Sequence, residues 1–242
     1  MMVEAVVFDF YGTLTAGRSE FAQSAARSAQ AAALGVNAVE YDRALSETYR
    51  ERFRGATGGV RESLAWVAAR LGKVPDEASL IRAEQVRIAT ERQFAEPRPE
   101  VVSLLQRLQA GGLRIGLISD CTAELPKVFE QLPIAELVDT AVFSCVTGQV
   151  KPDPSNYLSC CEELGVLPQR CVYVGDGGSD ELAGAARVGM HPVHLDVVGE
   201  RGGVVYGRHD TWPGDVIGSL LDVEPLLHEL ADHPRSAGRA AT

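Results

Sequence analysis

The feature that most constrains the fold is a series of short apolar runs, rich in β-branched residues, that end directly on a polar residue or a glycine. They lie at residues 3–8, 113–118, 140–143, 171–174 and, more weakly, 192–195. Near-continuous apolar runs of this length are typical of strands that are buried on both faces of a parallel sheet. Helical patterns separate the later runs, at residues 100–110, 123–132, 154–164 and 181–188. This alternation predicts an α/β fold with a doubly wound, Rossmann-like parallel sheet.

One segment interrupts the alternation, because residues 19–94 show only helical periodicity. Four helices are expected there, at residues 19–34, 40–54, 60–71 and 76–94. We therefore predict a core domain made of residues 1–15 and 97–225, with an inserted all-α cap domain over residues 16–96. The insertion follows the first strand, whose carboxyl end is where open α/β sheets bind ligands, so a lid is its natural role. Residues 233–242 are small and polar, and we expect a disordered tail.

Composition excludes several classes of partner. The formal net charge is −10, which argues against a nucleic-acid partner that is held through its phosphates. The opening apolar run is interrupted by Glu4 and is too short for a signal peptide or a membrane span. We expect a cytoplasmic protein with no membrane partner, present as a monomer or a homodimer.

Polar side chains that follow the predicted strands should gather at one edge of the sheet. Asp9, Ser119 and Asp176 each lie at a strand end, Lys151 follows the third strand, and Asp180 lies one turn beyond Asp176. Taken singly, such residues are common as turn residues and helix caps. Together, carboxylates brought to one edge would repel one another unless a cation were present. Oxygen ligands of this kind favour a hard divalent ion, usually Mg²⁺.

The pattern resembles the four motifs of the haloacid dehalogenase (HAD) superfamily. The order and context of the motifs match in the segment from Asp9 to Leu14, in Ser119, in Lys151, and in the segment from Gly175 to Asp180. The helical insertion is similar to the C1 cap of subfamily I of that superfamily. The resemblance covers residues 1 to roughly 225 and implies a hydrolase.

The resemblance also assigns roles to residues. It implies that Asp9 is the nucleophile and that Ser119 and Lys151 hold the transferring group. Mg²⁺ would be bound by Asp9, Asp176, Asp180 and the backbone carbonyl of Tyr11. Catalysis would involve Asp9, Tyr11, Ser119 and Lys151, and substrate would be bound by Gly12, Thr13, Ser119, Asp120 and Lys151. The expected activity is hydrolysis of a small phosphorylated metabolite through an aspartyl-phosphate intermediate.

Tyr11 is the main departure from the phosphatase pattern. HAD phosphatases usually have a second Asp at this position, which serves as general acid and base, whereas the L-2-haloacid dehalogenases have Tyr. A phenol is a poor base at neutral pH. In contrast, Asp120, Asp176 and Asp180 depart from the dehalogenase pattern, which has Asn after the motif-two Ser and needs no metal. We rank a Mg²⁺-dependent phosphatase first, a metal-independent L-2-haloacid dehalogenase second, and a catalytically weak phosphate-binding relic third.

Several arginines fall in the predicted cap. They are Arg43, Arg50, Arg52, Arg54 and Arg61. Arginines at such positions usually form a solvated helix face, and that is the expectation here. The alternative is that one of them reaches an anionic substrate.

Overall fold

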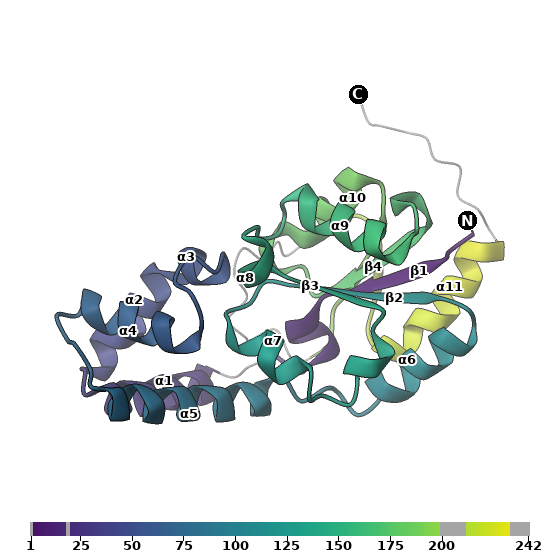
Figure 1. The fold of residues 1–242 in the computed structure, drawn as a ribbon. Helices are drawn as coiled ribbons and strands as arrows, with labels where there is room; N and C mark the ends of the chain where they lie inside the picture. The colour runs from purple at the N-terminus through teal and green to yellow at the C-terminus, as the bar shows by residue number, and fades with distance from the viewer. Residues whose placement is uncertain (1, 18–19, 199–211, 233–242) are drawn as a thin grey trace.

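The computed structural model describes residues 2–17, 20–198 and 212–232, and the predicted tail 233–242 lies outside this range (Figure 1). Within the described residues, six strands form one sheet in the order β3-β2-β1-β4-β5-β6. All neighbouring strands pair in parallel. The strands are β1 (Ala5–Phe8), β2 (Arg114–Ser119), β3 (Thr140–Phe143), β4 (Cys171–Gly175), β5 (His191–Leu195) and β6 (Asp215–Ile217). The predicted doubly wound parallel sheet is confirmed.

Helices cover both faces of this sheet. They are α6 (Val101–Ala110), α7 (Glu124–Phe129), α9 (Pro154–Leu164), α10 (Glu181–Val188) and α11 (Val223–Asp232). Figure 1 shows α6, α7 and α11 on one face and α9 and α10 on the other. The alternation along β1 explains the two layers, because Val6 and Phe8 pack in the cluster with α6 and α11, whereas Ala5 and Val7 pack in the cluster with α9 and α10.

The C-terminal part of the core differs from expectation. The sequence analysis did not predict β6, which has only three residues and a single buried apolar side chain, Ile217. It also missed α11, whose Val223, Leu227 and Leu230 belong to the main apolar cluster. The expected end of the core near residue 225 therefore falls inside a helix. The helix that we expected at residues 123–132 is shorter, because α7 ends at Phe129.

The inserted segment forms a helical lobe beside the carboxyl ends of the strands (Figure 1). It contains α1 (Glu20–Leu34), α2 (Ala38–Glu47), α3 (Tyr49–Phe53), α4 (Val60–Arg70) and α5 (Glu77–Phe94). The lobe has its own apolar cluster around Tyr41 and Leu64. The single helix expected at residues 40–54 is wrong, because the backbone leaves helical geometry at Thr48. The Thr48 hydroxyl donates to the carbonyl of Ala44 at 2.6 Å, a bond that competes with regular helix continuation.

Two linkers join the lobe to the core, and they contact each other. Thr15 and Pro97 form an isolated antiparallel bridge, and the amide of Arg98 donates to Leu14 O at 2.9 Å. The Arg98 guanidinium donates to Thr13 O, also at 2.9 Å. The two chain segments that connect the lobe to the core are thus held side by side. The exact limits of the cap and its movement as a lid stay predictions.

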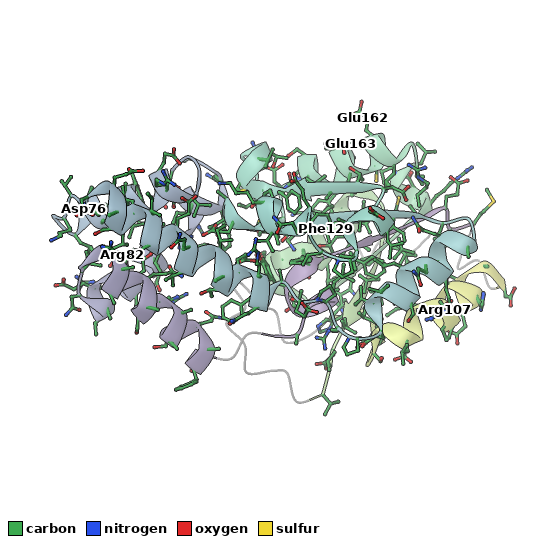
Figure 2. All side chains as sticks on the ribbon, turned by 60° about the horizontal axis from the view of Figure 1, so that its bottom comes forward. Asp76, Arg82, Arg107, Phe129, Glu162 and Glu163 are labelled. Carbon is green, nitrogen blue, oxygen red and sulfur yellow. The ribbon has the colours of Figure 1, made fainter. Side chains whose placement is uncertain are left out.

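Many charged side chains lie on the outer surface of both lobes. In Figure 2, Asp76, Arg107 and Glu162 extend outward, whereas Phe129 lies among packed side chains of the core. Arg107 on α6 forms an ion pair with Glu224 on α11 at 2.7 Å, which joins two neighbouring helices. Among the residues that the structure describes, no helix has both the length and the hydropathy that a membrane crossing requires.

The approach of α9 to the sheet generates a prediction at Gly116 of β2. A Cβ added there would lie 2.7 Å from Cys160 Sγ and 3.1 Å from Leu164 Cδ1. We expect Gly116→Ala to lower the free energy of unfolding by about 1–3 kcal/mol, the usual cost of overpacking a dense core. Urea unfolding would measure the loss. Gly218→Ala is the matched control, because its added Cβ would have nothing nearer than Asp222 Oδ2 at 4.0 Å.

A double variant separates overpacking from other causes. Cys160→Ala removes the sulfur that the new methyl group would meet first, so it should restore part of the stability lost in Gly116→Ala. Equal stability of Gly116→Ala and Gly218→Ala would contradict the packing of α9 on β2 described here.

Candidate active site

The strand ends meet at one cavity of about 230 Å³ between the core and the helical lobe. Because the strands are parallel, β1, β2 and β4 deliver Asp9, Asp120 and Asp176 to the same wall. Lys151 reaches this wall from the loop between α8 (Ser144–Thr147) and α9. The core side of the cavity is lined by Asp9, Tyr11, Gly12, Asp120, Lys151, Asp176 and Glu181, among others.

Lys151 is the centre of the polar contacts in this wall. Its ammonium, on a residue only 6% exposed, contacts Asp9 Oδ1 and lies 2.5 Å from Glu181 Oε2. Its backbone amide donates to Asp120 Oδ1 at 2.9 Å. Burial alone would lower the pKa of Lys151, but the carboxylates of Asp9, Glu181 and Asp120 outweigh burial and raise that pKa well above its usual range. The ammonium therefore stays charged and holds the surrounding carboxylates together.

Glu181 is a site residue that the sequence analysis missed. It is fully buried at the first position of α10. Tyr173 OH donates to its Oε2 at 2.8 Å and Gly177 N to its Oε1 at 3.0 Å. Burial raises the pKa of Glu181 to about 8, with a further increase from Asp9 and an opposing effect from Lys151. Both carboxylate oxygens are thus fixed, and one of them orients Lys151.

A left-handed turn decides that Glu181 lies in the site. Ser179 and Asp180 have φ values of 55° and 54°, which are rare for residues with side chains. The turn brings Glu181, and not Asp180, into the group of carboxylates whose oxygens lie within 4.8 Å of one another, which comprises Asp9, Asp176 and Glu181. No residue pattern in the sequence predicts such a turn. The sequence analysis therefore selected the neighbouring Asp180 instead of Glu181. Asp180 as a metal ligand stays a prediction.

Asp176 lies against the glycine of the first motif. Gly12 has φ of +83°, and a Cβ added there would lie 2.5 Å from Asp176 Oδ2. Asp176 Oδ1 accepts from Gly178 N at 2.9 Å, which orients the carboxylate. Only glycine permits both this backbone conformation and this approach. The motif glycine therefore keeps Asp176 next to the turn that follows Asp9.

The donor set of this wall suits a hard divalent cation. Asp9, Asp176 and Glu181 offer only oxygen atoms, and the space beside Gly12 is kept open for Asp176. Glu181 already accepts hydrogen bonds on both oxygens, so Asp9 and Asp176 are the better candidate ligands.

Two predicted substrate-binding hydroxyls are buried behind the cavity wall. Ser119 Oγ and Thr13 Oγ1 have no hydrogen-bond partner among the described residues. Neither residue lines the cavity, unlike the predicted Gly12, Asp120 and Lys151. Buried hydroxyls nearly always have a partner, so both retain unused donor capacity at the strand ends.

Tyr11 is paired with a residue from the helical lobe. Its hydroxyl donates to Glu91 Oε1 on α5, and both side chains line the cavity. The sequence analysis did not single out Glu91, which is 80 residues from Tyr11 in the chain. A carboxylate from the cap thus contacts the side chain at the position where the HAD phosphatase pattern has its second Asp.

The contacts of Lys151 lead to a stability prediction. Removing the ammonium in Lys151→Met would leave the buried Asp9 carboxylate without its ion-pair partner, and we expect a loss of about 3–5 kcal/mol in the free energy of unfolding. Urea unfolding in the presence of EDTA would measure it. Lys127→Met is the control, since that side chain is 58% exposed and lies 3.8 Å from Glu84. A loss in Lys151→Met no larger than in the control would show that the carboxylates do not depend on the ammonium.

The fold and this site define a class: an α/β core built on a parallel sheet, with an aspartate at the end of its first strand and a helical lobe beside the strand ends. A family model described as haloacid dehalogenase-like hydrolase matches residues 3–189. The chain belongs to this family and is a hydrolase, as the resemblance implied. The cap subtype stays a prediction.

Relatives and solved structures with both kinds of activity in their names are similar to this chain. Glyceraldehyde 3-phosphate phosphatase from Methanopyrus kandleri is 29% identical over 202 residues, which cover 80% of this chain and 84% of that protein. Phosphoglycolate phosphatase from Shigella boydii is 28% identical over 215 residues, covering 78% and 81%. The crystal structure of a 2-haloacid dehalogenase from Pseudomonas syringae superimposes with a TM-score of 0.69 at 24% identity, covering 94% and 99%. The structural likeness confirms the fold alone.

Proposed function

We propose that this hydrolase is a Mg²⁺-dependent phosphatase that acts on a small phosphorylated metabolite through an aspartyl-phosphate on Asp9. The observation that carries the proposal is the convergence of Asp9, Asp176 and Glu181 on one cavity wall, with Lys151 among them. Such a wall needs a cation before it can accept an anionic substrate. The sequence relatives named as phosphatases support the same activity.

The residues of the site divide the work of phosphoryl transfer. Lys151 holds Asp9 Oδ1, which leaves the other carboxylate oxygen to attack phosphorus. The bond from phosphorus to the leaving oxygen breaks, and that oxygen takes up a proton. Water then attacks the phosphorus, which releases inorganic phosphate and restores the Asp9 carboxylate. Mg²⁺, held by Asp9 and Asp176, would supply positive charge to the phosphoryl oxygens.

A metal-independent L-2-haloacid dehalogenase is the second candidate. Tyr11 favours it, because the chain lacks the usual second Asp of the phosphatases. The acidic wall opposes it, since a haloacid is itself an anion and such a reaction uses no metal ion to offset Asp176 beside Asp9.

The first test separates the two activities. With Mg²⁺, we expect turnover of acetyl phosphate, p-nitrophenyl phosphate and phosphoglycolate that is lost on addition of EDTA. Asp9→Asn should lower kcat by at least ~10³-fold, because it removes the nucleophile. Asp232→Asn, at an exposed position at the end of α11, is the matched control and should keep wild-type turnover. Chloride release from L-2-chloropropionate in EDTA, without phosphatase activity, would establish the dehalogenase instead. Phosphate binding by both wild type and Asp9→Asn, without turnover of any substrate, would indicate the catalytically weak phosphate-binding relic.

The second test concerns the leaving group. Because Tyr11 is a poor proton donor, we expect the kcat/KM of the wild type to fall as the pKa of the leaving group rises, from acyl and aryl to alkyl phosphates. Tyr11→Asp should improve alkyl esters by about 10²–10⁴-fold, the range for one added general acid. Tyr11→Phe is the control, since it loses the contact with Glu91 without adding an acid. A flat dependence in the wild type would show that another group supplies the proton. In that case, a kcat/KM that falls steeply with leaving-group pKa in Glu91→Gln would identify Glu91 as the proton donor. Glu84→Gln, two turns earlier on α5, is the control and should keep the flat dependence of the wild type.

A further inference from the structure

The cap arginines considered from sequence are exposed or already bound. Arg52 lines the cavity, so the solvated face that we expected is wrong for this residue, and its Nη2 donates to Leu45 O at 2.6 Å. The others are exposed or bound to surface carboxylates, as expected; they are Arg43, Arg50, Arg54 and Arg61. The reactive groups that the proposed phosphoryl transfer leaves unused are two thiols next to the second motif.

These two cysteines lie side by side at the edge of the cavity. Cys121 follows Asp120, lines the cavity and is 1% exposed. Cys145 belongs to α8 and is half-buried. Both are free thiols, and their sulfur atoms are 3.7 Å apart. Because β2 pairs with β3, the ends of these strands bring together two residues that are 24 positions apart in the chain.

Contacts with the backbone hold both cysteines in place. Cys121 N donates to Ser144 Oγ at 2.9 Å, and the Ser144 hydroxyl donates to Phe53 O of the helical lobe at 2.7 Å. A Cβ added at Gly55 of the lobe would collide with Cys145 O, so the lobe packs directly on Cys145. The two sulfur atoms are therefore kept within reach of each other.

The two thiols differ in acidity. A hydrogen bond from Cys121 lowers the pKa of the Cys145 thiol, and partial burial opposes this effect. Burial raises the pKa of the Cys121 thiol well above its usual range. Because the thiolate is the nucleophilic form of cysteine, Cys145 is the reactive member of the pair and Cys121 is its partner.

A second pair of cysteines provides an internal comparison. The sulfur atoms of Cys161 on α9 and Cys171 at the start of β4 are also 3.7 Å apart. A hydrogen bond from Cys171 lowers the pKa of Cys161 in the same way. However, these residues are 3% and 0% exposed, and neither lines the cavity. The two pairs thus agree in sulfur separation and differ in access from solvent.

We propose that Cys121 and Cys145 are an oxidation site, at which hydrogen peroxide produces a disulfide that reversibly lowers turnover. The Cys145 thiolate attacks one peroxide oxygen, the O–O bond breaks, and the leaving hydroxide takes up a proton to form water. The Cys121 thiol then loses its proton and attacks the sulfenic sulfur of Cys145. The S–S bond forms, the S–O bond breaks, and a second water leaves. Two thiols lose two electrons, and one peroxide is reduced to two waters.

The disulfide lowers turnover through the segment that carries Asp120. A disulfide bond is about 2.05 Å long, so at least one of the two cysteine side chains must move to form it. Asp120 precedes Cys121, and its Oδ1 accepts from the backbone amide of Lys151, whose ammonium contacts Asp9. Small displacements of such groups slow a reaction strongly. The effect on turnover rests on the proposed phosphatase function, whereas formation of the disulfide does not.

Peptide mapping tests formation of the disulfide. Cleavage before the aspartates gives fragments 120–138, 139–152 and 153–175, which contain Cys121, Cys145 and the other three cysteines, respectively. The folded protein is treated briefly with hydrogen peroxide, and the remaining thiols are alkylated. We expect the first two fragments to be joined by a disulfide that dithiothreitol reverses, while the third is fully alkylated. Separate fragments, or equal oxidation of Cys161 and Cys171, would overturn the inference.

Turnover of p-nitrophenyl phosphate with Mg²⁺ tests the effect on the site. Peroxide should lower kcat of the wild type by at least about 10-fold, and dithiothreitol should restore it. Cys145→Ala should keep its kcat in peroxide. Cys161→Ala, which removes one thiol of the buried pair, is the matched control and should lose activity like the wild type. An equal loss in Cys145→Ala, or a disulfide that leaves kcat unchanged, would overturn the effect on turnover.

The two measurements distinguish this inference from the proposed function. No turnover of any ester by the reduced protein, with the disulfide present after peroxide treatment, would overturn the phosphatase and leave the oxidation site standing. Turnover that is insensitive to peroxide, without a disulfide between Cys121 and Cys145, would overturn the oxidation site and leave the phosphatase standing.

Discussion

The Lys151 ammonium is the interaction on which the site depends. It lies between Asp9, at the end of β1, and Glu181, at the start of α10, and its own backbone amide contacts Asp120. Without a positive charge at this point, the parallel sheet would bring several carboxylates to one buried edge, where their repulsion opposes folding. One buried cation thus lets the fold concentrate acidic groups at the edge of the sheet, where the proposed phosphoryl transfer would need them.

The cavity is lined from two sides. The core side carries Asp9, Asp120, Asp176 and Lys151, whereas the helical lobe contributes Arg52, Arg87 and Glu91. The contact of Tyr11 with Glu91 and the ion pair of Arg87 with Glu124 both join the helical lobe to the core, so the shape of the cavity depends on how the lobe packs on the core.

Local pattern was enough to predict the sheet and most of its helices. The strands β1, β2 and β4 are buried on both faces and are therefore strongly apolar, whereas β3 alternates between buried and half-buried residues. Helix α9 begins with Pro154 and stops at Gly165 as its sequence signals require. Weak signals were missed for a physical reason: β6 is too short to show a pattern. The break at Thr48 is a change in the backbone angles of one residue, which helix propensity does not register.

By itself, the sequence determined which residues stand at the strand ends, because parallel strands deliver their carboxyl ends to one edge whatever the details of packing. Asp9, Ser119, Lys151 and Asp176 were found in this way. Of these, Ser119 does not line the cavity, whereas Asp120, which does, was implied only by the resemblance. The tertiary structure alone decided that Glu181, Glu91 and Arg87 join them. The left-handed turn at Ser179 and Asp180 turns Glu181 inward, and the packing of α5 against α7 carries Glu91 and Arg87 over the cavity. These placements depend on contacts between segments far apart in the chain, which no local spacing encodes.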